Sequence, residues 1–169
     1  MLVDTHAHLT MLELAEELPS VLQRALDAAV SAIVCPGVDL PSSREAVDLA
    51  RLHPRVRAAV GVHPNDCADL PPDWVDRLRS LAAEPEVVAI GEVGLDNYRQ
   101  HTRSDLQRAV LEAQLDLAAD LDLPVVIHDR EAHLELAEIL HKWVARLPAR
   151  HPRGVLHCFS GDRAFMEHC

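Results

Sequence analysis

Residues 2–10 read LVDTHAHLT, in which an apolar pair is followed by Asp4, His6 and His8 at alternate positions. Alternate residues of a β-strand point to the same side, so a strand through this stretch would place these three side chains on one face. Three potential ligands in the first possible strand indicate either a metal site or a coincidence in a chain with eleven histidines. The positions of the other histidines decide between these interpretations.

Short apolar runs alternate with longer amphipathic stretches along the chain. The apolar runs predict six strands, over Met1–Thr5, Ala32–Cys35, Arg57–Val62, Val87–Ile90, Pro124–His128 and Gly154–His157. The amphipathic stretches between them repeat apolar residues at three- and four-residue steps, which is typical of helices that bury one face. The sequence therefore predicts a strand followed by a helix, repeated six times.

The clearest helical pattern covers Arg103–Leu121, with Thr102 or Ser104 as its N-cap. Glu131–Val144 shows a second pattern, with an apolar face made of Leu134, Ala137, Leu140 and Val144. Three further helices are predicted from their proline-containing openings, which are Pro19-Ser20 (running to about Val30), Pro41-Ser42-Ser43 and Pro71-Pro72-Asp73.

Repeated strand–helix units predict an α/β fold with a parallel sheet covered by helices. A doubly wound sheet for nucleotides has a glycine-rich first turn, whereas here the first turn is the histidine stretch. A (β/α)₈ barrel carries its chemistry at the carboxyl ends of its strands, and it needs eight units and about 250 residues. We therefore predict a TIM-like (β/α)₈ barrel of which residues 1–169, as a single incomplete domain, contain the first six β/α units.

Metal-type ligands fall at the predicted strand ends. His6 and His8 follow the first strand, and Glu92 follows the fourth between Gly91 and Gly94. His63 follows the third strand, His128 closes the fifth and His157 closes the sixth. A single histidine at a strand end is usually a polar residue reaching solvent, but several in register indicate a common site. The predicted metal ligands are His6, His8, Glu92, His128 and His157.

Imidazole and carboxylate ligands suit zinc, manganese, iron, cobalt or nickel. Five protein ligands are more than one catalytic ion with an open position uses. Glu92 has two oxygens that can bridge a pair, so we expect two divalent ions, about 3.5–4 Å apart, with a hydroxide between them that attacks the substrate. Such a site hydrolyses phosphoesters or amide-like bonds, and spacing alone leaves this choice open.

Composition limits the classes of function. The net charge of -11 excludes a protein that binds nucleic acid through a broad basic surface, although bound metal ions can still meet phosphates locally. No apolar run reaches the length of about 20 residues that a membrane span needs. Cys35, Cys67, Cys158 and Cys169 show no metal-binding spacing, which indicates buried reduced thiols and a cytoplasmic protein.

The motifs DTHAHL, GVHP, GEVGLD, QLDLAADLDLPVVIHDREA and HCFSG, taken together and in this order, resemble the signatures of the TatD-type metal-dependent deoxyribonucleases. The resemblance implies a barrel that hydrolyses phosphodiester bonds in DNA with divalent ions, often from the 3′ end, and the acidic net charge favours short or single-stranded ends as substrate. It implies that the five predicted ligands match the family's metal ligands, with Glu92 as the catalytic carboxylate. His63 and Arg130 match positions at the mouth that we assign to substrate phosphate, since a guanidinium can grip phosphate oxygens in two places.

Asp4 is expected to support His6 and His8 from behind, because a carboxylate commonly orients a metal-bound imidazole. The chain departs from the family at Asn65, where relatives often have histidine. The family members also continue beyond the length of this chain and supply an aspartate after a seventh strand. We therefore expect poor nuclease activity from this 169-residue species, and no obligate protein partner is evident.

Two alternatives remain at this stage. One is another amidohydrolase-type enzyme that acts on a cyclic amide, lactone or phosphotriester. Such sites commonly bridge their metals with a modified lysine at the fourth strand, where this chain has Glu92, and its only lysine is Lys142. The other alternative is a metal-binding fragment without catalytic activity.

Overall fold

The computed structural model describes residues 2–99, 101–151 and 153–168. The six strands are β1 (Leu2–Asp4), β2 (Val30–Pro36), β3 (Val56–Val60), β4 (Val87–Asp96), β5 (Val125–Arg130) and β6 (Gly154–Leu156). The helices are α1 (Leu12–Ala15), α2 (Leu18–Asp27), α3 (Leu40–Leu52), the short 3₁₀ helix η1 (Pro64–Asp66), α4 (Trp74–Ala82), α5 (Ser104–Leu121), α6 (His133–Val144) and α7 (Arg163–His168).

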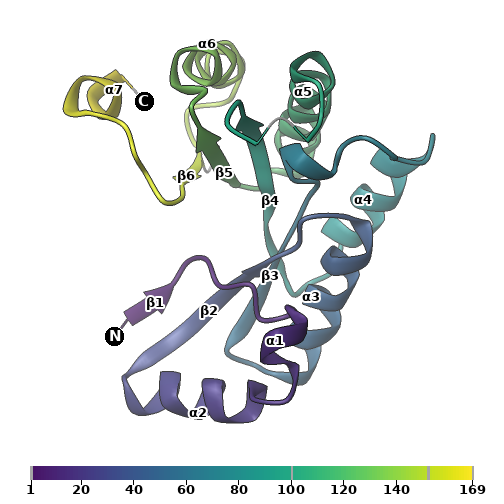
Figure 1. Cartoon of the computed structure of the whole chain (residues 1–169), viewed down its shortest axis with the longest axis vertical. Helices are drawn as coiled ribbons and strands as arrows, with labels where there is room; N and C mark the ends of the chain where they lie inside the picture. Colours follow the sequence, from purple (N-terminus) through teal and green to yellow (C-terminus); the bar gives the residue numbers. More distant parts are fainter. Residues whose placement is uncertain (1, 100, 152, 169) are drawn as a thin grey trace.

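All six strands are parallel and form one sheet in chain order, from β1 to β6. The sheet curves, and α2 to α6 lie around its outside, while β1 and α7 lie on the open side at the left of Figure 1. A parallel sheet wrapped by its crossover helices is the architecture of a β/α barrel. The predicted fold is confirmed as a half-barrel whose edge strands are β1 and β6.

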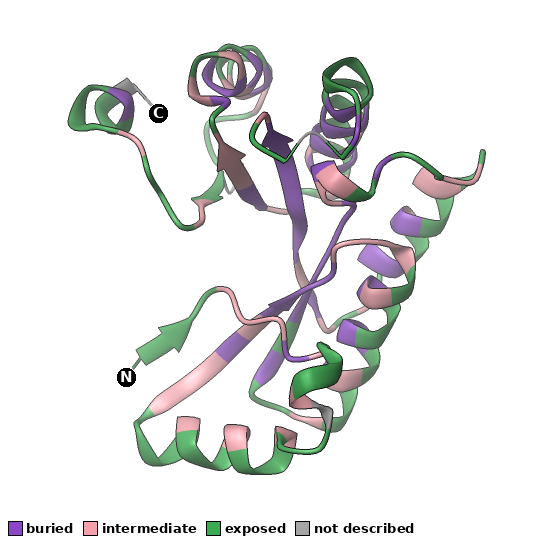
Figure 2. Ribbon diagram, in the orientation of Figure 1, coloured by how far each residue is buried: buried purple, intermediate pink, exposed green. Residues whose placement is uncertain are grey.

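The core is aliphatic and lies between the sheet and the surrounding helices. Ile90 and Val93 of β4 are fully buried, and so are Leu78 of α4 and Leu136 of α6. Figure 2 shows β4 buried along nearly its whole length and β1 exposed. With aromatic residues at only 3% of the chain, Leu, Ile, Val and Ala supply most of this packing.

The structure corrects the predicted bounds of several strands. β1 ends at Asp4, so the prediction of one strand face that carries Asp4, His6 and His8 is wrong, and both histidines lie in the irregular segment that follows. The predicted first residue of this strand, Met1, lies outside the described residues. The helix expected to reach Val30 ends at Asp27, because Ala29 has a φ of 61° and the chain turns there into β2.

β4 is longer than predicted and contains Glu92, which was expected to follow it. The glycines on either side bring β4 unusually close to β5. A Cβ atom at Gly91 would lie 2.6 Å from the Cβ atom of Val126, and one at Gly94 would overlap the backbone of His128. These glycines serve close strand contact rather than a turn, so the strand continues through Glu92 to Asp96.

Two helix predictions also need correction. α5 has no side-chain cap, since its N-cap residue is Arg103 and neither Thr102 nor Ser104 caps it. Leu134 of α6 was expected on the apolar face and is 83% exposed. The buried face of α6 is formed instead by Leu136, Ala137, Ile139 and Trp143.

The cysteine prediction holds for Cys35 and Cys67, which are buried free thiols. It is wrong for Cys158, which is exposed because it lies just beyond the edge strand β6 at a φ of 49°. Cys169 lies outside the described residues. Among the helices that the structure describes, none has the length and apolarity needed to cross a membrane.

Candidate metal centre

Glu92 lies at the middle of a cluster of histidines at the carboxyl end of the sheet. Its side chain projects from β4, and the residue is 3% exposed. The backbone N–H of Glu92 donates a hydrogen bond to the carbonyl oxygen of Gly37 after β2, at 3.0 Å. Burial on a central strand fixes the carboxylate where the strand ends meet.

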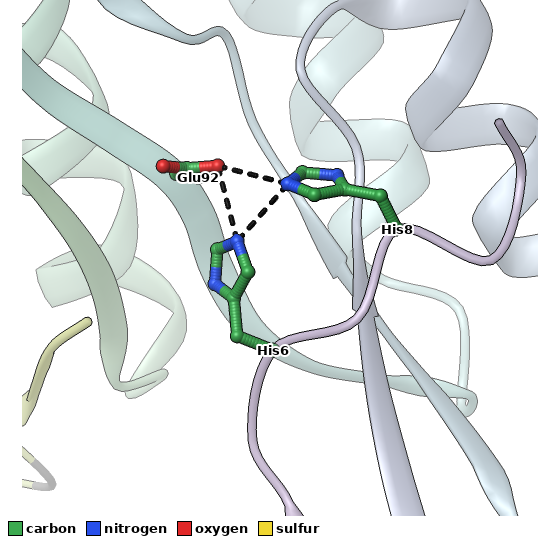
Figure 3. A group of neighbouring side chains, drawn as sticks. All are labelled: His6, His8 and Glu92. Atoms are coloured by element: carbon green, nitrogen blue, oxygen red, sulfur yellow. Dashed lines mark hydrogen bonds and ion pairs between the residues drawn. The ribbon is translucent and has the colours of Figure 1, made fainter. Parts of the chain in front are cut away.

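One carboxylate oxygen of Glu92 faces the two histidines that follow β1. Glu92 Oε2 lies 3.2 Å from His6 Nε2 and 3.3 Å from His8 Nε2, and the two Nε2 atoms are 3.0 Å apart. Figure 3 shows both rings turned toward the carboxylate, which approaches from the opposite side. Three potential ligand atoms from two separate segments thus converge on one point.

The second carboxylate oxygen faces a different set of histidines. Glu92 Oε1 lies 2.7 Å from His157 Nε2 and 2.9 Å from His128 Nδ1. His63 Nε2 is further away, at 3.8 Å. The two oxygens of a single carboxylate therefore serve two groups of imidazoles, which is the geometry expected of a ligand that bridges two cations.

The two groups are joined by a ring contact between the edges of the sheet. The imidazoles of His6, after β1, and His157, after β6, stack with centroids 3.8 Å apart and planes 7° apart. The strands that carry them stand at opposite ends of the strand order. The cluster therefore brings together parts of the chain that the sheet itself keeps separate.

The donor set fits divalent cations. Imidazole nitrogens converge with carboxylate oxygens at 2.7–3.3 Å, and His6 Nε2 and His8 Nε2 face one another although only one of them can donate to the other. His6 Nδ1 and His128 Nε2 are buried without a hydrogen-bond partner among the described residues. Buried polar atoms normally have partners, and the imidazole nitrogens and carboxylate oxygens that converge here are ligand types that divalent transition-metal ions accept.

Charge at the cluster follows from these contacts. Burial disfavours the ionised form of Glu92, but hydrogen bonds from His128, His157, His6 and His8 outweigh burial and hold its pKa well below the ordinary range. The hydrogen bond to Glu92 raises the pKa of His8, against the opposing effect of burial. The carboxylate is therefore ionised at neutral pH and available to a cation.

His63 differs from the other histidines of the cluster. Burial lowers its pKa to about 4, so the ring is neutral at physiological pH. His63 Nδ1 accepts a hydrogen bond from the backbone N–H of Asn65 at 3.1 Å, which leaves the proton of the neutral ring on Nε2. This Nε2–H lies toward Glu92 and can donate to an anion, as the predicted contact with phosphate requires, and the ligand atoms of His63, Glu92 and His128 also lie close enough together to hold a metal ion.

Arg130 ends β5 beside this cluster, and its guanidinium lies 4.0 Å from the ring centroid of Tyr98. Arg130, His63 and Glu92 line one open pocket of about 350 Å³ at the mouth of the half-barrel. The structure therefore brings the predicted phosphate-binding residues together with the predicted metal ligands.

Asp4 is placed differently from the expectation that it supports a ring. Its Oδ1 accepts a hydrogen bond from the backbone N–H of His6 at 3.0 Å, and the residue is exposed. Asp4 thus orients the chain after β1 rather than either imidazole.

Sequence reasoning missed Asp96, which is 1% exposed. Its Oδ2 accepts a hydrogen bond from Asn65 Nδ2 at 2.9 Å and lies 3.4 Å from His128 Nε2. Buried Gln107 donates to the Asp96 carbonyl and accepts from its N–H. The sequence shows an aspartate at the end of GEVGLD, but it does not show that this residue contacts Asn65 of η1 and Gln107 of α5.

The family model described as TatD related DNase matches residues 3–169. The proteins named 3′-5′ ssDNA/RNA exonuclease TatD from Salmonella typhimurium and Escherichia coli K12 are 37% and 38% identical over 166 residues, each covering 98% of this chain. The chain spans 62% of the length of these curated relatives.

A solved structure shares the fold. The crystal structure of YjjV, a TatD homologue from Escherichia coli K12, superposes with a TM-score of 0.89 at 30% identity, and the match covers 99% of this chain and 63% of that one. The half-barrel, the converging histidines and the family match agree with the resemblance carried by the five motifs. The chain belongs to the TatD related DNase family.

Proposed function

We propose that the protein is a divalent-metal-dependent hydrolase that cleaves phosphodiester bonds in DNA, acting from the 3′ ends of single strands. The family match and the printed name of the relatives, 3′-5′ ssDNA/RNA exonuclease TatD, support this proposal. The observation that carries it is the division of Glu92 between two histidine groups, because hydrolysis by two cations needs a ligand that holds both.

In this proposal, His6 and His8 on one side of Glu92, and His128 and His157 on its other side, would hold the divalent cations together with the Glu92 carboxylate. Cations bound there supply positive charge to the scissile phosphate and lower the pKa of water. The chain's own groups bind and orient the substrate: His63 donates from Nε2 to a phosphate oxygen, and Arg130 donates from its guanidinium. Asn65 and Tyr98 hold these two side chains in position.

The charge of the chain indicates the form of the substrate. With a net charge of -11, binding must depend on cations and a few arginines at the mouth. Short or single-stranded ends suit such a local site better than long duplexes. The affinity for DNA should fall with salt with a slope equivalent to only a few phosphates. A slope near ten would contradict this restriction to local contacts.

The test compares Glu92→Gln with Glu138→Gln, which makes the same change at an exposed position of α6. The measurements are bound metal by elemental analysis and Mn²⁺-dependent release of nucleotides from single-stranded DNA. We expect Glu92→Gln to lose metal and at least about a hundredfold in activity, and Glu138→Gln to retain both. Full activity in Glu92→Gln would refute the proposal, and metal binding without any hydrolysis by the unaltered chain would favour a fragment without catalytic activity.

A further inference from the structure

We propose that Arg99 forms a second phosphate subsite, which binds the phosphate next to the scissile one in a single strand. This inference rests on the proposed function, since it names a further part of the same substrate. Arg99 belongs to the loop between β4 and α5 and lines the pocket of about 350 Å³ that contains Glu92, His63 and Arg130.

The first argument is charge. Most arginines of this acidic chain lie against carboxylates, for example Arg51 with Glu84 at 2.7 Å and Arg79 with Asp120 at 2.7 Å. Within the described part of the chain, neither Arg99 nor Arg130 has a carboxylate within ion-pair distance. Where carboxylates are abundant, two guanidinium groups in one pocket that have no carboxylate partner among the described residues are available to an anion from solution.

The carboxylates that share this pocket are already engaged. Glu92 is held by the histidines. Asp96 accepts hydrogen bonds from Asn65 Nδ2 and from the backbone N–H groups of Tyr98 and Arg99. Asp66 Oδ2 lies 3.7 Å from His63 Nδ1, and among the described residues no ion pair joins Asp66 to Arg99. The charge of Arg99 is therefore not neutralised within the pocket.

The second argument is the anchoring of the loop. Asp96 Oδ1 accepts the N–H groups of Tyr98 at 3.0 Å and Arg99 at 2.8 Å, so a buried carboxylate fixes the start of the loop. Buried Gln107 of α5 donates to the carbonyls of Asp96 and Thr102, at 3.2 and 2.9 Å, and so holds both ends of the loop. A binding group on an anchored backbone loses less entropy when its ligand arrives.

The third argument is the division of labour between the two arginines. Arg130 contacts the ring of Tyr98 at the end of β5 and lies two residues after His128 in the sequence, so it suits the phosphate at the cations. Arg99 is exposed and reaches the pocket from the loop above. Consecutive phosphates of a single strand would then meet two guanidinium groups in succession.

The experiment compares TpT, which has one phosphodiester link, with TpTpT, which has two. Arg99→Gln removes the proposed contact. Arg103→Gln is the matched control, because it removes the same charge from the same loop at an exposed residue that is paired with Asp105 and does not line this pocket. Circular dichroism and the melting temperature confirm that both variants are folded.

We expect Arg99→Gln to raise the KM for TpTpT by about tenfold and to leave TpT unchanged within about twofold, because a charge-assisted hydrogen bond to phosphate is lost. Arg99→Lys should lie between these values, since it keeps the charge without the planar fork. Arg103→Gln should match the unaltered chain on both substrates. Equal effects of Arg99→Gln on TpT and TpTpT, or equal effects of the two glutamine variants, would overturn the inference.

A second readout does not depend on turnover. Binding of fluorescein-labelled TpTpT is followed by anisotropy at several salt concentrations in the presence of EDTA. Arg99→Gln should reduce the salt slope by about 0.7, the value for one phosphate contact in a single strand, and Arg103→Gln should not. A chain that shows this Arg99-dependent slope but hydrolyses neither substrate would refute the proposed function and retain the subsite. An unaltered chain that does not bind TpTpT would overturn the subsite.

Discussion

β4 and the edge strands β1 and β6 differ in almost every structural respect, yet they supply the same cluster. β4 has ten residues that are nearly all buried, whereas β1 and β6 have three residues each and are largely exposed. Glu92 comes from the first of these environments, and His6 and His157 follow the edges. The Glu92 carboxylate therefore stands on a buried strand, whereas the rings of His6 and His157 that meet it follow exposed strands at the two edges.

The largest predicted difference between a buried region and an edge of the sheet is in the reactivity of two thiols, Cys67 and Cys158. Burial raises the pKa of Cys67 from its ordinary value of 9.0 to about 12, whereas Cys158 beyond β6 is exposed. At pH 8, iodoacetamide should label Cys158 about a thousandfold faster than Cys67, as measured by mass spectrometry of the labelled peptides. Comparable rates would show that the region where Cys67 packs against Val62 and Val110 opens as readily as the edge.

The raised pKa of Cys67 predicts that the stability of the folded chain depends on pH. Because the pKa of Cys67 is higher in the folded than in the unfolded chain, the unfolded state ionises first as pH rises. The stabilisation from the neutral thiol is complete below about pH 9 and is lost toward about pH 12. The stability difference between the unaltered chain and Cys67→Ala, measured by denaturant unfolding, should shrink across this window, and a constant difference would contradict the raised pKa.

The next largest effect should be the loss of unfolding free energy when a core side chain is truncated. Ile90→Ala in β4 removes a fully buried side chain, and we expect it to lower the free energy of unfolding by about 3 kcal/mol, as measured by urea denaturation. A loss below about 1 kcal/mol would mean that the centre of the half-barrel can collapse around the cavity.

Alanine substitutions of two aspartates compare how much stability the side-chain hydrogen bonds contribute at the end of the central strand β4 and at the end of the edge strand β1. Asp96→Ala at the end of β4 removes the acceptor for Asn65, Tyr98 and Arg99, and we expect a loss of about 2 kcal/mol. Asp4→Ala at the end of β1 removes one exposed hydrogen bond to His6 and should cost less than about 1 kcal/mol. Thermal unfolding of both variants ranks the two positions, and equal losses would remove the distinction between centre and edge.

The smallest effect is expected at the surface of the edge strand. Val3→Ala changes a side chain that is 50% exposed and should alter the free energy of unfolding by less than about 0.5 kcal/mol in the same urea assay. A loss near that of Ile90→Ala would show that β1 is covered in solution, for instance by a second copy of the chain.

Strand order and the gathering of His6, His8, Glu92, His128 and His157 were predictable, because parallel strands bring their carboxyl ends to one edge. Element bounds were less so. Gly91 and Gly94 resemble turn residues in the sequence, but their function is close contact with β5. No local pattern distinguishes these two uses of glycine, since the neighbouring strand decides between them.

The missed polar residues show a second limit. Gln114 of α5 donates to the Val62 carbonyl and accepts from the Val62 N–H, although the residues are 52 positions apart. Gln107 makes a similar pair of bonds with Asp96. Helical periodicity assigns a glutamine to the exposed face, and only the tertiary structure shows that these side chains are buried connectors between the helix and the strand ends.

The stacked rings of His6 and His157 have a consequence for folding as well as for chemistry. Cations held by Glu92 with His6 on one side and His157 on the other would bind only the folded chain, in which these two residues, roughly 150 positions apart, come together. Cations in this cluster, connected through Glu92, would thus act as a reversible cross-link between the segments that follow the first and last strands of the sheet. Availability of metal would then set how tightly the two edges of the half-barrel are held together.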